Sequence, residues 1–338
     1  MKFGLTVAAA LVGFGVAAVA ITTFTVPPIA ATQNGWRGTG MVQIDTPKNK
    51  AAAKAANAVP EAQPKADPSG EKSSAAYENV KVLGDLDSAE FLRVMQAITE
   101  WVSPEQGCAY CHKEGESLAD DSLYTKVVAR RMLQMTMDIN TGWKAHVAET
   151  GVTCYTCHRG QPVPANVWFA QPAEKAQAYA GNKDKQNTPL PIVGATSLPH
   201  DIFSPYLAKA GEIRVEGAKA LPTGKNPSIQ MTEGTYGLMM HMSSGLGVNC
   251  TFCHNTQNFA EWSTSTPQRV TAWHGIRMSR ELNLNYLESL NSAFPANRKG
   301  PLGDVAKVNC ATCHQGVNKP LNGANMVQDY LALKSASK

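Results

Sequence analysis

The stretch TGVTCYTCHRG at residues 150–160 places Cys154, Cys157 and His158 within five consecutive positions. The same arrangement recurs as CAYCH at 108–112, CTFCH at 250–254 and CATCH at 310–314. These four copies contain all 8 cysteines of the 338-residue chain. We therefore expect a fold that is organised around four copies of one chemical unit.

Each copy has the C-x-x-C-H pattern that attaches a c-type haem. Its two thiols can form thioether bonds with the two vinyl groups at one edge of the porphyrin, and its histidine can then present a neutral imidazole to the iron. Zinc sites and disulfides also use cysteine pairs, but neither explains why a histidine follows every pair. The sequence therefore predicts four covalently bound haems. The expected thioether residues are Cys108, Cys111, Cys154, Cys157, Cys250, Cys253, Cys310 and Cys313, and the expected proximal iron ligands are His112, His158, His254 and His314.

The composition argues against a nucleic-acid-binding protein. Charged residues make up 17% of the chain and the formal net charge is only +4, whereas such proteins carry a larger and clustered basic excess. Aromatic residues are sparse, at 7%. We therefore expect haems to occupy part of the core in place of ordinary side chains.

The N-terminal segment is apolar and uncharged from Leu5 to Val26. The hydrophobic core of a signal peptide is about 7–15 residues long, whereas a membrane-spanning helix needs about 20. The length favours a retained signal-anchor, and a signal peptide cleaved near Ala30 or Ala31 is the alternative. Either reading places the rest of the chain outside the cytoplasm.

Shifts in composition divide the rest of the chain. Two regions with two motifs each suggest an internal duplication, and the segments that flank them are rich in Ala, Lys, Pro or Gly, which is typical of linkers. The expected segments are a signal-anchor at 1–31, an extended periplasmic tether at 32–76, a first dihaem half at 77–170, a loop-rich connector at 171–231, a second dihaem half at 232–320 and a C-terminal tail at 321–338.

Hydrophobic periodicity predicts a mainly helical fold in which a helix precedes each motif. The first helix is expected over residues 87–104, with Asp87 as its N-cap. A second is expected over residues 121–151, and a shorter, glycine-rich one over 235–247. The fourth is expected to open with Thr266 as its cap. No convincing strand pattern is present.

The ligand opposite each proximal histidine decides whether an iron can bind small molecules or only pass electrons. The helices before the first three motifs offer Met95, Met132 and Met239 for this position. A methionine on a helix is more often core filler than a ligand, but the repeated order of helix and motif favours ligation. A Met/His iron is expected to have a higher reduction potential than a His/His iron.

The fourth unit departs from this pattern. Aligning the chain on Asn140 and Asn283 places Gly275 where Met132 stands, and a glycine has no side chain to ligate. The remaining candidates are Met278 and the histidines outside the motifs, His146, His200, His241 and His274. His146 lies fourteen residues after Met132, so a single helix could present two ligands about 21 Å apart on one face.

Long runs outside the motifs carry further information. They include WRGTGM, YENVKVLGDLDSAEFLRVMQAITEWVSPEQGCAYCH, VVARRMLQMTMDINTGWKAHVAETGVTCYTCHRG, GLGVNCTFCHNTQ and VNCATCHQG. Together they resemble the tetrahaem cytochrome c subunit of purple-bacterial photosynthetic reaction centres over nearly the whole chain. Some members of that family carry a lipid on an N-terminal cysteine. This sequence lacks such a cysteine, which favours a retained membrane helix.

The resemblance implies the sixth iron ligands. These are Met95, Met132 and Met239 for the first three haems and His146 for the fourth. Met240 and Met242 lie close enough to Met239 to remain alternatives for the third haem.

The resemblance also implies the function. Such a subunit is an electron carrier and not an enzyme, and it lies on the periplasmic side of the bacterial inner membrane. It would take electrons from a soluble donor, such as a small c-type cytochrome or a high-potential iron–sulfur protein. It would then re-reduce the photo-oxidised bacteriochlorophyll dimer of the L- and M-type membrane subunits.

Acidic residues gather beside the first motif, where residues 105–121 contain five carboxylates and one base, Lys113. A run of charge is usually only a solvated surface. We nevertheless expect this one to steer a basic soluble cytochrome to the first haem. The acidic residues are Glu105, Glu114, Glu116, Asp120 and Asp121.

The strongest alternative is a membrane-anchored multihaem quinol dehydrogenase or another respiratory multihaem oxidoreductase. Such an enzyme would use mainly His/His ligation and would need an open iron coordination site or a quinol pocket with a general base. No site of that kind is evident in the sequence. A redox titration separates the two readings, because only the carrier is expected to show high potentials with a methionine–iron absorption band.

Overall fold

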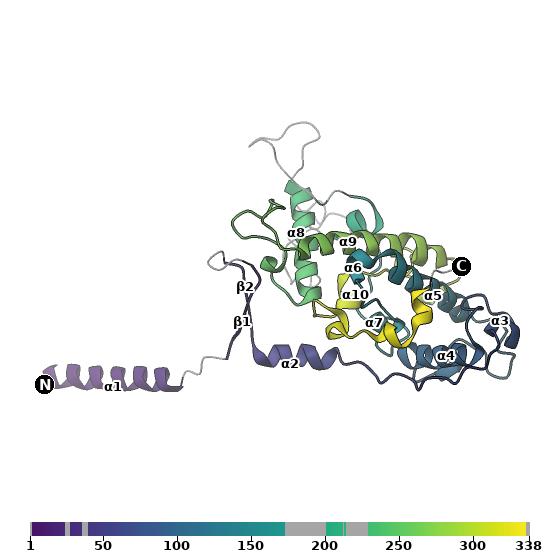
Figure 1. The fold of residues 1–338 in the computed structure, drawn as a ribbon. Helices are drawn as coiled ribbons and strands as arrows, with labels where there is room; N and C mark the ends of the chain where they lie inside the picture. The colour runs from purple at the N-terminus through teal and green to yellow at the C-terminus, as the bar shows by residue number, and fades with distance from the viewer. Residues whose placement is uncertain are drawn as a thin grey trace, which may run out of the picture.

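The computed structural model describes residues 2–23, 28–35, 40–172, 201–211, 213 and 229–335. Within these residues the fold is mainly helical, as predicted, and Figure 1 shows its arrangement. The helices are α1 (Lys2–Thr23), α2 (Pro47–Ala56), α3 (Ser73–Ala76), α4 (Ser88–Val102), α5 (Tyr124–Gly142), α6 (Lys144–Val147), α7 (Cys154–His158), α8 (Ile229–Leu246), α9 (Gln268–Glu281) and α10 (Cys310–His314). The strands are β1 (Ala30–Gln33) and β2 (Val42–Asp45), and shorter helical turns include η1 (Gly107–Tyr110), η3 (Ser204–Ala208), η4 (Cys250–Phe252) and η5 (Leu282–Leu287).

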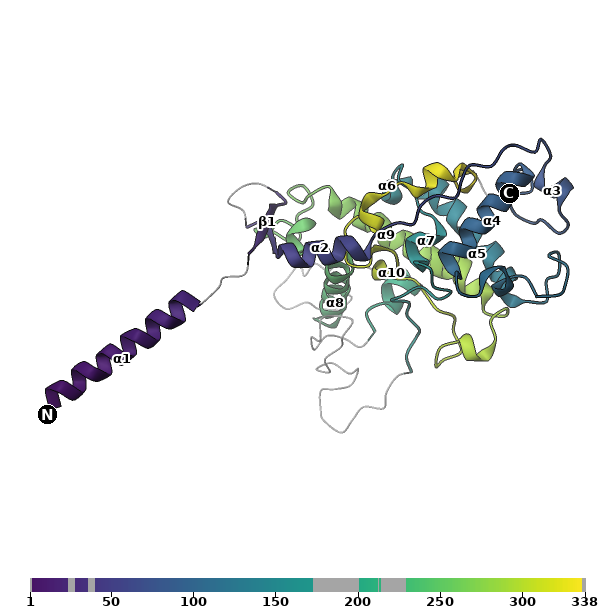
Figure 2. The ribbon, with the colours of Figure 1, turned by 90° about the horizontal axis from the view of Figure 1, so that it is seen from below.

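The N-terminal helix α1 stands apart from the rest of the chain (Figures 1 and 2). Its stretch Thr6–Thr23 has a mean hydropathy of 2.0, and none of it is buried within the protein. A helix of about 20 residues is long enough to cross the hydrocarbon core of a bilayer. The helix is therefore suited to anchoring in a membrane, in agreement with the sequence.

A small hairpin follows α1 and was not expected from the sequence. Its strands β1 and β2 pair antiparallel, with Ala30 opposite Asp45. Asn249, beside the third motif, donates from Nδ2 to the carbonyl of Val42 at 2.9 Å, which fixes the hairpin against that motif. Strands of four residues are too short for their alternation to be recognised in a sequence. Residues 36–39, part of the run WRGTGM, lie outside the described residues.

The segment expected to be an extended tether contains the helix α2. The hydroxyl of Thr46 caps this helix by accepting a hydrogen bond from the backbone N–H of Asn49 at 3.1 Å. Pro47 opens the helix and an alanine-rich run continues it, both of which favour helix formation. The helix ends at Asn57, which is 1% exposed and donates to the carbonyl of Gln315 at 3.3 Å. The segment is therefore partly helical and docked, and not wholly extended.

Four helices, one from each motif unit, lie in a row (Figure 1). Helix α8, which precedes the third motif, packs against α10, the helix of the fourth motif. Helix α10 packs against α7, the helix of the second motif, and α7 packs against α4, which precedes the first motif. The motif units therefore follow one another in space in the order first, second, fourth, third.

The C-terminal segment packs into the core of the first unit. The rings of Tyr330 and Trp101 meet edge to face with centroids 4.7 Å apart, and the guanidinium of Arg93 lies 4.3 Å from the Tyr330 centroid. Val327 and Leu333, three residues to either side, are also buried. Residues 321–335 are thus part of the core and not a free tail, because their apolar residues recur every three positions and cover one edge of α4.

Part of the expected connector also enters a core. Within residues 201–211, Ile202, Phe203 and Leu207 are buried in a cluster that includes Leu238 of α8. The connector is therefore not only a loop. Its residues 173–200, 212 and 214–228, and with them His200, lie outside the described residues.

The first predicted helix is confirmed. The carboxylate of Asp87 accepts a hydrogen bond from the N–H of Ala89 at 2.9 Å, and α4 ends at Val102, ahead of Pro104. Helix α8 begins at Ile229 and is longer than the predicted 235–247.

Two other helix predictions are wrong in detail. The single helix expected over 121–151 is interrupted at Trp143, whose φ of −111° and ψ of 31° separate α5 from α6. Met132 and His146 therefore do not share one straight helix, and the predicted separation of about 21 Å along one helix face does not apply. Thr266 does not cap α9, because its hydroxyl donates to the carbonyl of Phe252 and the helix begins at Gln268.

Candidate functional site

The four C-x-x-C-H motifs adopt two alternating geometries. The second and fourth form the one-turn helices α7 and α10, each closed by a capping box. In α7 the N–H of Thr153 donates to Oγ1 of Thr156, and in α10 the N–H of Asn309 donates to Oγ1 of Thr312, both at 3.0 Å. The first and third motifs form the tighter turns η1 and η4. This alternation is what duplication of a two-motif unit would produce.

Each motif histidine is held by a hydrogen bond from its Nδ1 to a backbone carbonyl. The pairs are His112 with Leu118 at 3.1 Å, His158 with Gln161 at 2.8 Å, His254 with Phe259 at 3.0 Å and His314 with Val317 at 3.0 Å. A carbonyl can only accept, so Nδ1 carries the proton and Nε2 keeps the lone pair that a metal needs. Burial lowers the pKa of all four histidines, to about 4 for His314, which keeps the rings neutral.

His146 and His314 lie opposite each other. Their ring centroids are 6.0 Å apart and their planes are inclined by 70°. Nδ1 of His146 is bonded to the carbonyl of Thr271 at 2.9 Å, so its Nε2 is left for a ligand. Two imidazoles that bind one metal from opposite sides, through bonds of about 2.0 Å, have centroids about 6 Å apart. The spacing therefore fits one iron between these two rings.

Gly275 of α9 makes room for His146. A Cβ atom at this glycine would lie 2.5 Å from Cε1 of His146, closer than any side-chain atom can approach. The position that aligns with Met132 thus has no side chain that could ligate and leaves space for the imidazole of His146.

Met95 and Met132 occupy equivalent places on α4 and α5. Each is followed four residues later by a threonine whose hydroxyl donates to the carbonyl of the methionine, Thr99 at 3.0 Å and Thr136 at 2.9 Å. Oγ1 of Thr99 also lies 4.0 Å from Sγ of Cys108, and α5 packs against α7. The helix turn that carries each methionine therefore adjoins the motif that follows it.

The same spacing separates Met239 from Ser243 in α8. Met240 precedes Ser244 in the same way, but Ser244 is exposed whereas Ser243 is partly buried. Met242 belongs to the apolar cluster beside α8. A methionine four residues before a hydroxyl residue that is at least partly buried is thus a pattern shared by three units, and it favours Met239 for the third site.

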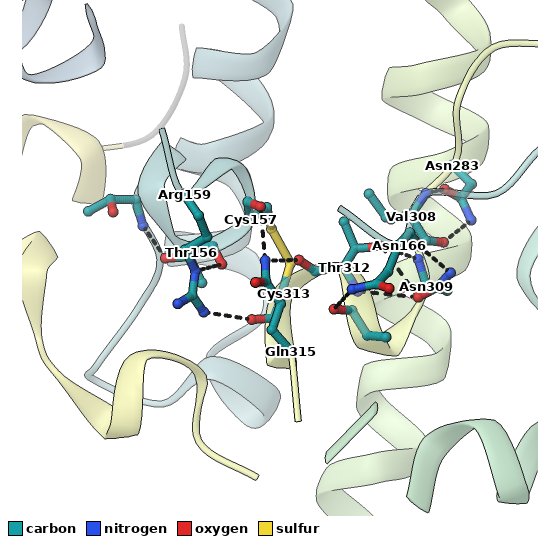
Figure 3. The surroundings of a disulfide bond; sticks show 12 residues. Thr156, Cys157, Arg159, Asn166, Asn283, Val308, Asn309, Thr312, Cys313 and Gln315 are labelled. Carbon is teal, nitrogen blue, oxygen red and sulfur yellow. Dashed lines mark hydrogen bonds between the residues drawn. A yellow bond between two sulfur atoms is a disulfide. The ribbon is translucent and has the colours of Figure 1, made fainter. Parts of the chain in front are cut away.

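The second and fourth motifs meet at a junction, shown in Figure 3. Cys157 and Cys313 form a disulfide there, with Cα atoms 4.4 Å apart, and the other six cysteines are free. A sulfur atom cannot bond both to a second cysteine and to a haem vinyl group. The predicted thioethers at these two positions therefore require the reduced cysteines, and the disulfide identifies the two as immediate neighbours.

Two hydrogen bonds cross this junction in opposite directions (Figure 3). Nη2 of Arg159 donates to the carbonyl of Cys313 at 3.4 Å, and Nε2 of Gln315 donates to the carbonyl of Cys157 at 3.2 Å. Arg159 and Gln315 each follow a motif histidine, and each has a left-handed backbone, with φ of 52° and 47°. Asn57 joins them, accepting from Arg159 at 3.0 Å and donating to Gln315 at 3.3 Å.

Two buried asparagines hold the backbone two residues before a motif. Asn140 accepts from the N–H of Val152 at 2.7 Å and donates to its carbonyl at 2.9 Å. Asn283 makes the same pair of bonds to Val308 at 2.8 and 3.0 Å (Figure 3). The sequence alignment used these two asparagines as reference points but assigned them no role. Their equivalent positions before the second and fourth motifs were the signal that could have indicated a shared structural role.

The residues present fit covalent haem better than zinc. No cluster of three or more His, Cys, Asp or Glu side chains suited to a metal ion occurs in the described part of the chain. A structural zinc site needs four such ligands around one point. Single imidazoles beside a cysteine pair, with His146 added opposite His314, instead match the edge and axial positions of a porphyrin.

The five carboxylates beside the first motif divide into two groups. Glu116 pairs with Lys113, and Asp120 accepts from the N–H of Ser122, so both have partners, as Asp121 does. Asp121 pairs with Lys126 at 3.1 Å and with Arg130 at 2.8 Å, and its hydrogen bonds, the one from Arg130 first, lower its pKa. Glu105 and Glu114 are exposed, and neither forms an ion pair with the described residues. Asp121 is thus a structural residue, whereas Glu105 and Glu114 leave their charge to the solvent.

Comparison with known sequences gives a consistent result. The sequence model of the family described as "Photosynthetic reaction centre cytochrome C subunit" matches residues 25–334. A photosynthetic reaction center cytochrome c subunit from Rubrivivax gelatinosus is 55% identical over 92% of this chain and 85% of its own length. The corresponding subunit of Thermochromatium tepidum is 50% identical over 91% and 76%, and that of Roseobacter denitrificans is 42% identical over 94% and 88%.

Proposed function

The chain belongs to the family of photosynthetic reaction centre cytochrome c subunits, and on that premise we propose that it carries electrons from a soluble periplasmic donor to the photo-oxidised bacteriochlorophyll dimer. It is a membrane-associated electron-transfer subunit with covalently bound haem c, and not an enzyme. The respiratory enzyme considered as the alternative is not favoured by these relatives.

The proposed number of haems is four, one at each C-x-x-C-H motif. When bound, each haem supplies a one-electron redox centre, and a row of four supplies a conducting path. The protein residues fix the position of each centre through two cysteine sulfurs and hold the tautomer of each proximal imidazole through a backbone carbonyl. The proposed proximal ligands remain His112, His158, His254 and His314.

The sixth ligands proposed are Met95, Met132 and Met239 for the first three sites and His146 for the fourth. The observation that carries the proposal is the pair His146 and His314, whose ring spacing of 6.0 Å suits one iron between them. Irons closed on both sides by protein ligands pass electrons and do not take up substrates. The fourth site is proposed to have a lower potential than its Met/His neighbours.

The spatial order of the motifs suggests the direction of electron flow. The third motif adjoins the hairpin that follows α1 through the bond from Asn249 to Val42, so we place it on the side of the membrane and of the L- and M-type subunits. The first motif lies at the other end of the row of helices (Figure 1). Electrons are therefore proposed to enter at the first site and to leave from the third.

The surface of the first motif supports this assignment. Cys108 is exposed, as is the side chain of Leu118, at 68%, whose carbonyl holds the ring of His112. Glu105 and Glu114, in the same segment of the sequence, carry exposed negative charge. The combination suits a soluble donor with a basic rim, such as a small c-type cytochrome, and less well a high-potential iron–sulfur protein without one.

A flash experiment on membranes tests the proposed function. Excitation should first bleach the bacteriochlorophyll dimer, after which the dimer should recover as the haem α-band is oxidised. Recovery of the dimer without any haem oxidation would refute the proposed role. The same experiment tests the side of the membrane, with a mild protease that releases the part of the chain after α1. If this part lies on the periplasmic side, external protease should abolish the fast recovery in right-side-out vesicles and not in inverted vesicles.

A further inference from the structure

An arginine side chain lies at the junction of the second and fourth motifs without an ion pair to any carboxylate of the described residues. Arg159 donates from Nε to the carbonyl of Thr156 at 3.1 Å, and from Nη2 to Oδ1 of Asn57 at 3.0 Å and the carbonyl of Cys313 at 3.4 Å. These acceptors are all neutral. Its Nη1 is buried and has no hydrogen-bond partner among the described residues.

This arrangement is unusual because an enclosed charged group is normally paired, and Nη1 of the partly buried Arg159 is enclosed without a partner among the described residues. An arginine stays protonated in proteins, so the group keeps its positive charge although burial lowers its pKa. No carboxylate of the described residues forms an ion pair with Arg159. Its charge is therefore not offset by a side-chain carboxylate of the described residues, and it acts on the groups that lie beside it.

The neighbours of the guanidinium are the attachment points of two haems. Arg159 follows the proximal His158 directly and is bonded to the carbonyl of Cys313. Cys157 lies at the same junction, with its Cα 4.4 Å from that of Cys313. The charge therefore stands next to the thioether positions of both the second and the fourth motif.

The position equivalent to Arg159 in the fourth motif carries no charge. Gln315 also follows a motif histidine, has the same left-handed backbone and makes the reciprocal bond to Cys157. The hydrogen-bonded brace thus needs only an amide, as Gln315 demonstrates. The additional feature that Arg159 contributes is its positive charge.

We propose that Arg159 sets the reduction potentials of the two central haems, raising those held at the second and fourth motifs above the values that their axial ligands alone would give. The inference rests on the proposed attachment of haem at these motifs. Removing an electron from a haem iron, Fe(II) to Fe(III) + e⁻, adds one positive charge to the site. A fixed positive charge beside it disfavours that oxidised form, and no proton is exchanged.

The test is a redox titration of each haem in the detergent-solubilised reaction centre, followed by optical spectra. In Arg159→Gln the reduction equilibria of the second and fourth haems should shift toward oxidation by between threefold and tenfold, where tenfold corresponds to 59 mV for one electron. Those of the first and third haems should shift less. Arg159→Lys, which keeps the charge, should retain potentials close to those of the unmodified protein.

Gln315→Glu is the matched variant on the opposite side, because it adds a negative charge at nearly the same size; it also removes the bonds that Nε2 donates to the carbonyls of Cys157 and Thr312. It should also lower the potentials of the second and fourth haems, and it decides the question if Arg159→Gln does not assemble. Equal shifts in Arg159→Lys and Arg159→Gln would show a purely structural brace and overturn the inference, as would unchanged potentials in Gln315→Glu. A pyridine haemochrome count below four in the unmodified protein would instead refute the proposed function.

Discussion

His146 and His314 come from distant parts of the sequence and face each other at the proposed fourth site. His146 stands on α6, between the first two motifs, whereas His314 closes the last motif, yet their ring centroids are 6.0 Å apart. The fourth site is therefore built from both motif pairs, and helix α6 packs against α9 to complete it. A substitution that displaces either histidine should therefore affect this site more than the other three.

Gly275→Ala should displace His146, because the new Cβ would lie 2.5 Å from its ring. We expect the fourth iron to lose one ligand and to bind carbon monoxide, at about one quarter of the total haem. Carbon monoxide difference spectra of the reduced protein measure this. Gly142→Ala is the control, since only Asp138 lies near its Cβ, at 3.6 Å. Six-coordinate spectra in Gly275→Ala would contradict the assignment of His146.

Asn283→Ala should destabilise the protein. Asn283 is fully buried, and its loss leaves the N–H of Val308 without its partner and removes the bonds that Asn283 donates to the carbonyls of Val308 and Leu207. Each buried group left unsatisfied costs about 1–3 kcal/mol, so the thermal midpoint should fall clearly. Thermal unfolding followed by circular dichroism measures the change. The exposed Asn297→Ala is the control, and an equal midpoint for both variants would refute the role of Asn283.

Asp87→Asn should change the response of the protein to acid. Hydrogen bonds, the one from the Ser69 backbone first, lower the pKa of Asp87 to about 2. Its folded pKa lies below its unfolded one, so the stabilisation is complete above about pH 4 and is lost as the pH falls toward 2. The variant should have a lower thermal midpoint at pH 7 and a flatter decline between pH 4 and 2. The exposed Asp67→Asn should keep the original profile.

Glu105→Gln combined with Glu114→Gln should slow the association of a basic cytochrome donor at low salt. Both carboxylates are exposed beside the first motif, and steering by surface charge is screened by salt. The second-order rate of haem re-reduction after a flash, measured at several ionic strengths, should fall and depend less on salt. Glu61→Gln, in the segment before α4, is the control. An unchanged salt dependence would exclude these two residues from donor steering.

Met239→Leu should remove the methionine–iron absorption band of one haem and lower its potential. Met240→Leu should leave both unchanged, because its partner Ser244 is exposed where Ser243 is partly buried. Optical redox titration of the two variants compares them directly. If the band were lost only in Met240→Leu, Met240 and not Met239 would be the ligand of the third haem.

The helical class and the helix before each motif could be predicted because amphipathic periodicity and caps such as Asp87 act over a few residues. The packing of Tyr330 on Trp101 could not, since it joins residues far apart in the chain. Thr46 is a different case. Thr46 followed by Pro47 is a local capping signal for α2, but the Ala- and Lys-rich composition of the segment is also typical of a linker, which is what was predicted.

The site was predictable to a similar degree. Covalent chemistry fixes the spacing of two cysteines and a histidine, so each motif is visible in the sequence. Gly275 signalled a missing ligand, but the break at Trp143 that carries His146 to its place depends on tertiary packing. The position of the Arg159 charge at the junction could not be predicted either, because its neighbours come from the end of α2 and from the fourth motif.

The central claim is that four haem irons are bound to this chain and that protein side chains close each of them on both faces. Carbon monoxide difference spectra of the reduced protein, normalised to haem content by the pyridine haemochrome, test it most directly. The account predicts four haems per chain and no carbon monoxide uptake. Fewer than four haems, or uptake of carbon monoxide by the unmodified protein, would contradict it.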